Sequence, residues 1–100
     1  MEYQIKFIQS VLKEDIPKIK KSGINLEALH RSIKKLETNP YGSSRAKSGD
    51  LSNIRGMDWN KGYRILFVID EIEKIVKIVS IDCHDDAYKK AKKRNKNKLK

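Results

Sequence analysis

The chain has 100 residues and a formal net charge of +10, which allows one small domain and leaves little room for a second. No apolar run approaches the ~20 residues of a membrane span. We expect no signal peptide, because Glu2, Gln4 and Lys6 interrupt the apolar residues at the start of the chain. The single cysteine, Cys83, excludes an internal disulfide and a multi-cysteine zinc site. It suits a reducing compartment, so we expect a cytoplasmic protein.

The positive charge is concentrated at one end of the chain. Of the 23 Lys and Arg residues, eight follow Tyr88 with no acidic residue among them, so the first 88 residues carry only 15 basic and 13 acidic side chains. A basic end binds polyanions by displacing counterions from phosphates, but it can equally be a solvated, frayed terminus. We predict one domain over residues 1–94 and a basic, frayed tail over residues 95–100.

The first half of the chain predicts one strand and two helices. Apolar and polar residues alternate over 3–8, as in a half-buried strand. Ser10 is placed to cap a helix, and Pro17 inside its apolar stripe should kink or split that helix. Asn25 is placed to cap a second helix, which ends at Thr38. The two helices form a hairpin.

The second half predicts a basic loop, three strands and a helix. The Gly- and Ser-rich segment 41–49 is expected to be a mobile loop, and strands follow at residues 51–59, 63–70 and 75–81. The second of these strands is apolar on both faces except at Arg64, as expected for a central strand. Asp85 or Asp86 can cap a last helix through about Arg94. The order β-α-α-β-β-β-α predicts an α+β fold with a helical hairpin packed on a mainly antiparallel, four-stranded sheet.

Five short motifs occur along this pattern in a fixed order. They are Tyr3-Gln4-Ile5-Lys6-Phe7, Leu36-Glu37-Thr38-Asn39-Pro40, Gly62-Tyr63-Arg64-Ile65-Leu66-Phe67, Ile78-Val79-Ser80-Ile81 and His84-Asp85-Asp86-Ala87-Tyr88. With them the chain resembles the RelE/ParE superfamily of toxins from toxin–antitoxin systems over residues 2–94. The resemblance implies a toxin, a cognate antitoxin that covers the toxin's groove with a helix or strand, and a hetero-oligomer of the two.

The resemblance implies more than one activity. Many members are endoribonucleases that cut ribosome-bound mRNA and inhibit translation, whereas others inhibit DNA gyrase on the same fold. An inactive member that only binds its antitoxin is a further alternative. RNA cleavage needs a base for the 2′-hydroxyl, a cation at the phosphate and an acid for the departing 5′-oxygen. We expect no cofactor and no metal for this chemistry.

Arg64 is the first candidate for the phosphate-binding cation. Its guanidinium presents a planar fork of donors, and it matches the family's catalytic arginine. The alternative role is an ion pair with Asp58 or stacking on Trp59. A two-residue turn after Asn60 would place Trp59 opposite Arg64 and put Arg55 on the same side, whereas a three-residue loop would place Asp58 there and turn Arg55 away. The resemblance implies the first register, with Arg55 as a second catalytic cation.

His84 and Tyr88 are the other catalytic candidates. A histidine can transfer protons near neutral pH, and the resemblance places an arginine or histidine near position 84. The alternatives are a surface histidine at a helix start and a metal site with Asp82, Cys83 and Asp85, whose neighbouring side chains diverge. Tyr88 lies one helical turn after His84 and matches a family tyrosine that lies near the phosphate or stacks on a base; it can also simply anchor the helix.

The remaining basic candidates are expected to hold RNA without reading its sequence. They are Arg45, Lys47, Lys61, Lys89, Lys92 and Lys93.

Overall fold

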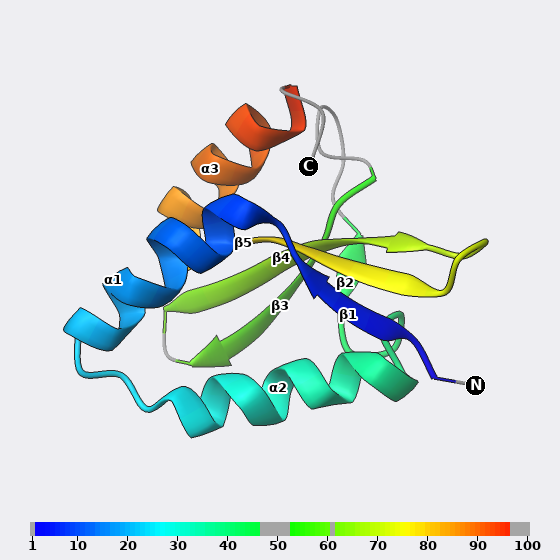
Figure 1. The fold of residues 1–100 in the computed structure, drawn as a ribbon, viewed down its shortest axis with the longest axis horizontal. Coiled ribbons are helices and arrows are strands. Elements are labelled where there is room, and N and C mark those ends of the chain that lie inside the picture. The colour runs from blue at the N-terminus through cyan, green and yellow to red at the C-terminus, as the bar shows by residue number, and fades with distance from the viewer. Residues whose placement is uncertain (1, 47–52, 61, 97–100) are drawn as a thin grey trace.

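The computed structural model describes residues 2–46, 53–60 and 62–96 (Figure 1). In chain order its elements are the strand β1 (Gln4–Phe7), the π-helical turn η1 (Val11–Asp15), the helices α1 (Ile16–Lys21) and α2 (Leu26–Thr38), the strands β2 (Arg45–Ala46), β3 (Arg55–Asn60), β4 (Tyr63–Asp70) and β5 (Ile75–Cys83), and the helix α3 (His84–Lys96). The predicted α+β fold is confirmed. The two-residue strand β2 lies within the segment predicted as a loop and adds a fifth strand.

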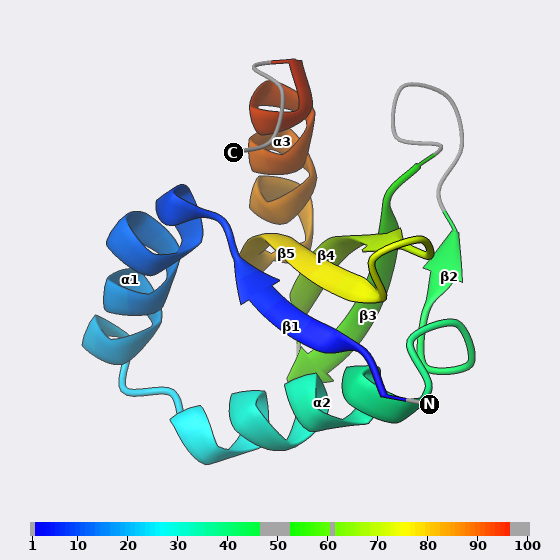
Figure 2. The same cartoon turned by 45° about the vertical axis from the view of Figure 1, so that its right-hand side comes forward.

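The sheet has the strand order β1-β5-β4-β3-β2, with β1 parallel to β5 and the other pairs antiparallel. The helix α2 packs against β1 and β3, while α3 packs against β4 and β5 from the opposite side (Figures 1 and 2). Ile65, Leu66 and Phe67 of β4 are fully buried, as expected for a central strand between two helical layers. Burial of each such side chain contributes about 1.5–3 kcal/mol to folding.

The first helical segment is split one residue before Pro17. Because proline lacks an N–H and its ring crowds the carbonyl four residues earlier, a regular α-helix cannot run through this position. The chain forms the wider turn η1 instead, in which the Ile16 N–H bonds to the Val11 carbonyl, and α1 then begins with Pro17 in its first turn. This turn buries Asp15 completely.

Of the predicted helix caps, only Asn25 is observed. Its side chain accepts a 2.8 Å hydrogen bond from the Glu27 N–H. The cap predicted at Ser10 is wrong, because this residue already has helical dihedral angles and its hydroxyl makes no cap bond. The cap at Asp85 or Asp86 is also wrong, because α3 begins at His84 and places both carboxylates inside its first turn.

The register between β3 and β4 differs from the one implied by the resemblance. Asp58 pairs with Arg64 and Asn60 pairs with Tyr63, with a register shift at Trp59 between them. Trp59 is buried and packs edge-on against Tyr63, so the bulge accommodates this large side chain in the core. The predicted pairing of Trp59 with Arg64 is therefore wrong.

The end of the chain is helical further than predicted. Residues 95 and 96 of the predicted tail belong to α3, and residues 97–100 lie outside the described residues.

Candidate nucleic-acid interface

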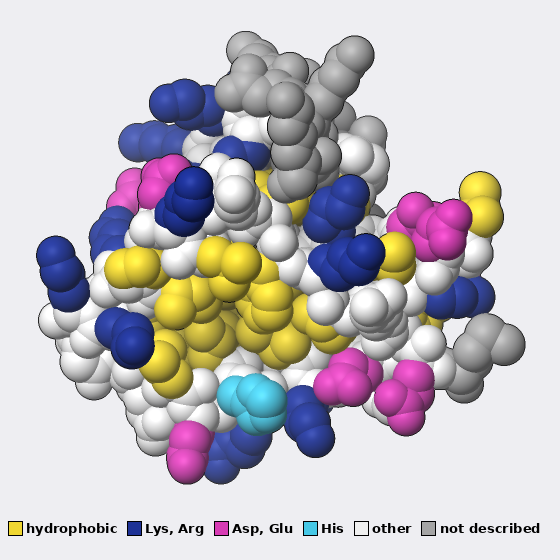
Figure 3. Space-filling view, in the orientation of Figure 1, with side chains coloured by type: hydrophobic (Ala, Val, Ile, Leu, Met, Phe, Trp, Pro, Cys, Tyr) yellow, Lys and Arg dark blue, Asp and Glu magenta, His cyan; other side chains and the backbone are white. Residues whose placement is uncertain are grey.

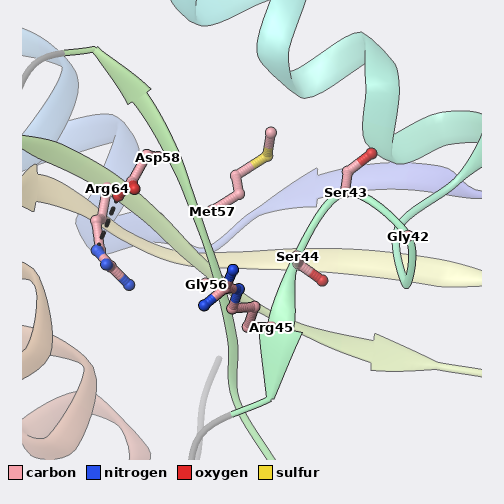
Figure 4. Close-up of a pocket in the computed structure, with 8 residues that line it drawn as sticks. All are labelled: Gly42, Ser43, Ser44, Arg45, Gly56, Met57, Asp58 and Arg64. Carbon is pink, nitrogen blue, oxygen red and sulfur yellow. Dashed lines mark ion pairs between the residues drawn. The ribbon is translucent and has the colours of Figure 1, made fainter.

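A half-open pocket of about 350 Å³ lies between the segment after α2 and the strands β3 and β4 (Figure 4). Its lining is rich in polar groups and comprises Gly42, Ser43, Ser44, Arg45, Gly56, Met57, Asp58 and Arg64. Figure 4 shows Met57 pointing toward α2, whereas Arg45 and Arg64 extend to the other side of the strands. The lining of the pocket therefore contains two guanidinium groups, two hydroxyl groups and one carboxylate.

Arg64 is held from two sides. Its Nε lies 2.9 Å from Asp58 Oδ1, and its Nη1 donates a 2.7 Å hydrogen bond to the Tyr88 hydroxyl. Its guanidinium carbon also lies 5.7 Å from the centre of the Tyr88 ring. The Asp58 side chain is 70% exposed, so its charge is strongly screened by water. Arg64 thus has a fixed orientation and a weakly held counter-ion.

Arg45 is the second cation of the pocket. It lies on β2 and pairs in register with Gly56 of β3. Because Gly56 has no side chain, nothing from that position fills the space beside Arg45. From the sequence, Arg45 is expected only as an RNA-binding cation in a loop. Its position beside Arg64 follows from the pairing of β2 with β3, and a two-residue strand gives no recognisable periodicity.

Arg55 does not share the pocket with Arg64. It pairs with Phe67, three positions beyond Arg64 on β4, and it is not one of the described residues that line the pocket. Its guanidinium instead bonds to Ser44 and to the Tyr41 carbonyl. The joint Arg55–Arg64 clamp implied by the predicted register is therefore not formed.

Tyr88 and His84 both lie on α3. The half-buried Tyr88 packs against the core, which is the anchoring role considered for it, and its hydroxyl accepts a hydrogen bond from Arg64. His84 is the first residue of α3, one helical turn before Tyr88. The structure describes only the backbone of His84.

Two basic residues of the C-terminal helix belong to a buried ion network. Lys90 Nζ lies 2.9 Å from Asp15 Oδ1 and 2.7 Å from Asp82 Oδ2, and Arg94 contacts both Asp15 oxygens at 2.9 and 3.0 Å. Lys18 Nζ lies 3.0 Å from Asp82 Oδ2. Both carboxylates are almost completely buried, at 0% and 1% exposure. Through the two carboxylates, these cations connect α3 with η1 and connect both α1 and α3 with the end of β5.

Backbone groups of β5 complete this network. Asp15 accepts a 2.8 Å hydrogen bond from the Ile81 N–H, and Arg94 donates a 2.7 Å bond to the Val79 carbonyl. Burial acts to raise the pKa of Asp82, but hydrogen bonds from Lys90 and Lys18 outweigh it and hold that pKa below its usual range.

The other predicted RNA-binding cations fall into two groups. Lys89, Lys92 and Lys93 have exposed side chains on α3. Lys47 and Lys61 lie outside the described residues.

Asp82, Cys83 and Asp86 have potential metal-ligand atoms within 4.8 Å of one another. Lys18 and Lys90 already neutralise Asp82, however. The hydrogen bond to Asp82 also raises the pKa of the Cys83 thiol, whereas a metal ligand or nucleophile must be the thiolate. The chemistry of this cluster does not favour a metal ion.

The surface also carries an apolar patch. Figure 3 shows apolar side chains gathered between α1 and α2 beside β1, with basic and acidic side chains around them. Within the described residues, no helix combines the length and apolar character needed to cross a membrane.

Comparisons with known proteins give one relative and several structures. No family model matches the chain. A curated protein of Methanocaldococcus jannaschii named "Putative toxin RelE4" is 28% identical over 87 residues, which cover 87% of this chain and 84% of the relative. A mutant of E. coli toxin RelE in the free state has a TM-score of 0.67 at 18% identity, covering 94% of this chain and 98% of that one.

A chain of the toxin–antitoxin complex RelBE2 from Mycobacterium tuberculosis has a TM-score of 0.64 at 17% identity, covering 84% of this chain and 100% of that one. These comparisons confirm the resemblance to RelE-type toxins, and the chain has the RelE-like fold.

Proposed function

We propose that this chain is a RelE-type toxin that cleaves mRNA on the ribosome. The observation that carries the proposal is the pocket in which Arg45 and Arg64 lie together, with the Tyr88 hydroxyl bonded to Arg64. Two guanidinium groups match the charge and the geometry of a phosphate. The RelE-like fold and the relative from M. jannaschii support the assignment as a toxin.

In the proposed reaction, the 2′-hydroxyl oxygen attacks the neighbouring phosphorus and the bond from phosphorus to the 5′-oxygen breaks. Negative charge builds on the non-bridging phosphate oxygens, where Arg64 and Arg45 stabilise it. Asp58 pairs with Arg64 in the absence of RNA and gives way to the phosphate, since this exposed ion pair is weak.

Proton transfer is assigned to His84, with Tyr88 as the supporting hydroxyl. His84 begins α3 one turn before Tyr88, so its backbone lies close to the residue that touches Arg64. An imidazole can accept the 2′-proton or donate to the leaving 5′-oxygen near neutral pH.

The exposed lysines of α3 are proposed to bind ribosomal RNA, as are Lys47 and Lys61. Contacts of this kind neutralise phosphates without reading sequence, so they add affinity without choosing the cut site.

The proposed partner is an antitoxin. The chain is similar to a chain of the RelBE2 complex, which contains toxin and antitoxin. An apolar patch surrounded by charged side chains fits an amphipathic segment of such a partner (Figure 3).

The test is induction of wild type, Arg64→Ala and Arg31→Ala in cells, with mapping of mRNA 5′ ends and of DNA supercoiling. Arg31 is an exposed arginine on α2 and serves as the matched control. We expect codon-phased mRNA cuts in wild type and Arg31→Ala and a loss of roughly 10²–10³-fold in Arg64→Ala. Gyrase-linked DNA damage with intact mRNA would overturn the proposed nuclease activity.

A further inference from the structure

We propose that Arg55 is a positioning residue, which holds the segment 41–45 in place and thereby fixes Arg45 in the pocket. The importance of Arg45 for RNA rests on the proposed function. The role of Arg55 in the segment can be measured without RNA.

The donors of Arg55 are directed to this segment. Its Nε donates a 2.8 Å hydrogen bond to the Ser44 hydroxyl, and its Nη2 donates to the carbonyls of Tyr41 and Ser44 at 3.1 and 3.2 Å. Its guanidinium carbon also lies 5.1 Å from the centre of the Tyr41 ring. One planar group therefore holds two positions of the segment at once, which the single ammonium of a lysine cannot reproduce.

The segment is also fixed at its start. The Gly42 N–H donates to the Asn39 side chain at 3.0 Å, and the Ser43 N–H donates to the Asn39 carbonyl at 3.1 Å. A Cβ at position 42 would meet the terminal amide atoms of Asn39, so a larger residue would displace the Asn39 side chain that accepts this bond. The Ser44 hydroxyl donates to the Pro40 carbonyl at 2.5 Å.

A contact from the β4–β5 turn secures Tyr41 itself. Its hydroxyl donates a hydrogen bond to the Glu71 carboxylate, which raises the pKa of Tyr41 to about 12. Glu71 also accepts a 2.6 Å hydrogen bond from the Tyr3 hydroxyl and pairs with Lys74. Tyr41 is therefore held by Glu71 on one side and by Arg55 on the other.

The consequence for the pocket follows from chain order. Arg45 comes directly after Ser44, the residue that Arg55 holds through both its hydroxyl and its carbonyl. Loss of Arg55 releases Ser44 and lets Arg45 move away from Arg64. Arg55 thus acts on the phosphate through Arg45 and does not touch RNA.

A double-mutant cycle tests this role. RNA cleavage on programmed ribosomes is measured for Arg55→Ala, Arg45→Ala, Arg64→Ala and their pairs, with Arg31→Ala as the control. We expect Arg55→Ala to reduce kcat/KM by roughly 10- to 100-fold, as loss of a charged hydrogen bond does. Arg55→Ala should cause no further loss of kcat/KM in a protein that already carries Arg45→Ala. In a protein that carries Arg64→Ala, the fold-losses of the two variants should multiply. A multiplied loss with Arg45→Ala would overturn the proposal, because Arg55 would then act on RNA by itself.

A second readout needs no RNA. Amide hydrogen exchange at Ser43 and Ser44 should become faster in Arg55→Ala and in Ser44→Ala, but not in Arg45→Ala, with cooperative unfolding retained. The variant Arg55→Lys should restore little of the protection. Unchanged exchange in Arg55→Ala, or full activity in Arg55→Lys, would contradict the positioning role. If the wild type does not cleave RNA, the proposed function fails, and hydrogen exchange still decides whether Arg55 holds the segment.

Discussion

Two groups of charged side chains in this molecule both consist of ion pairs, but they differ in how far their carboxylates are exposed to water. In the network of Asp15, Asp82, Lys90 and Arg94, the carboxylates are almost fully buried and lie 2.7–3.0 Å from the cationic nitrogens. In the pocket, Arg64 pairs with an Asp58 side chain that is 70% exposed. Burial of the carboxylate, rather than the presence of an ion pair, separates a cation committed to the fold from one that, in the proposed function, exchanges its partner for a phosphate.

Asp15→Asn should have the largest effect on stability. It leaves Lys90 and Arg94 facing a neutral group in a buried site, which costs about 3–5 kcal/mol of unfolding free energy. Urea unfolding measures the loss. Glu14→Gln is the matched control, because its 65% exposed carboxylate lies 3.8 Å from Arg94 and should contribute less than about 1 kcal/mol. Equal losses of unfolding free energy in the two variants would show that buried and exposed ion pairs contribute equally to stability.

The depressed pKa of Asp82 predicts sensitivity to acid. A carboxylate whose folded pKa lies below its ordinary value of 3.8 stabilises the fold fully above that value, and the contribution is lost as pH falls toward the folded pKa. The unfolding free energy of the wild type should therefore decline between about pH 5 and pH 2. Asp82→Asn should be less stable at pH 7 and should decline less over this range. A parallel decline in both proteins would show that Asp82 is not the group responsible.

The exposed lysines of α3 should affect binding and not stability. Replacing Lys89, Lys92 and Lys93 together by Gln should lower the slope of log affinity against log salt by about 2, since each lost phosphate contact on a single strand accounts for about 0.7. Urea unfolding should be unchanged, and so should the positions of the RNA cuts. The matched comparison is Lys90→Gln, which should lower stability because Lys90 contacts two buried carboxylates. Relocated cuts in the triple variant would mean that these lysines help to choose the site.

Asp58→Asn should have the smallest effect and the opposite direction. Removal of the carboxylate beside Arg64 should tighten binding of a short single-stranded RNA by up to about fivefold, the scale of an exposed ion pair. Fluorescence anisotropy at low salt measures the change. Weaker binding would indicate that Asp58 is needed to orient Arg64 for the phosphate.

The sequence predicted those features that depend on local pattern. The apolar character of residues 63–70 identified the central strand, and Asn25 identified a helix start. The sequence did not predict the register shift at Trp59, because this bulge depends on packing of the indole against Tyr63. The position of Arg45 was likewise set by a strand of two residues.

The role of the C-terminal cations could not be read from composition. Lys90 and Arg94 are among the eight basic residues that follow Tyr88, yet their carboxylate partner Asp15 lies 75 and 79 positions earlier. A contact of this range depends on the π-helical turn before Pro17, which sequence periodicity does not show. Two of the eight positive charges that follow Tyr88 are therefore already neutralised by buried carboxylates.

The bonds from Asp15 and Arg94 to β5 have a consequence for solubility. Strand β5 pairs with β1 only as far as Ile78, which lies opposite Phe7. Without Asp15 and Arg94, the Val79 carbonyl and the Ile81 N–H beyond this point would be open to pairing with another strand. The side chains of Asp15 and Arg94 are bonded to each other and form hydrogen bonds with these two backbone groups, as a neighbouring strand would. An open edge of this kind invites edge-to-edge aggregation, and here an ion pair closes it.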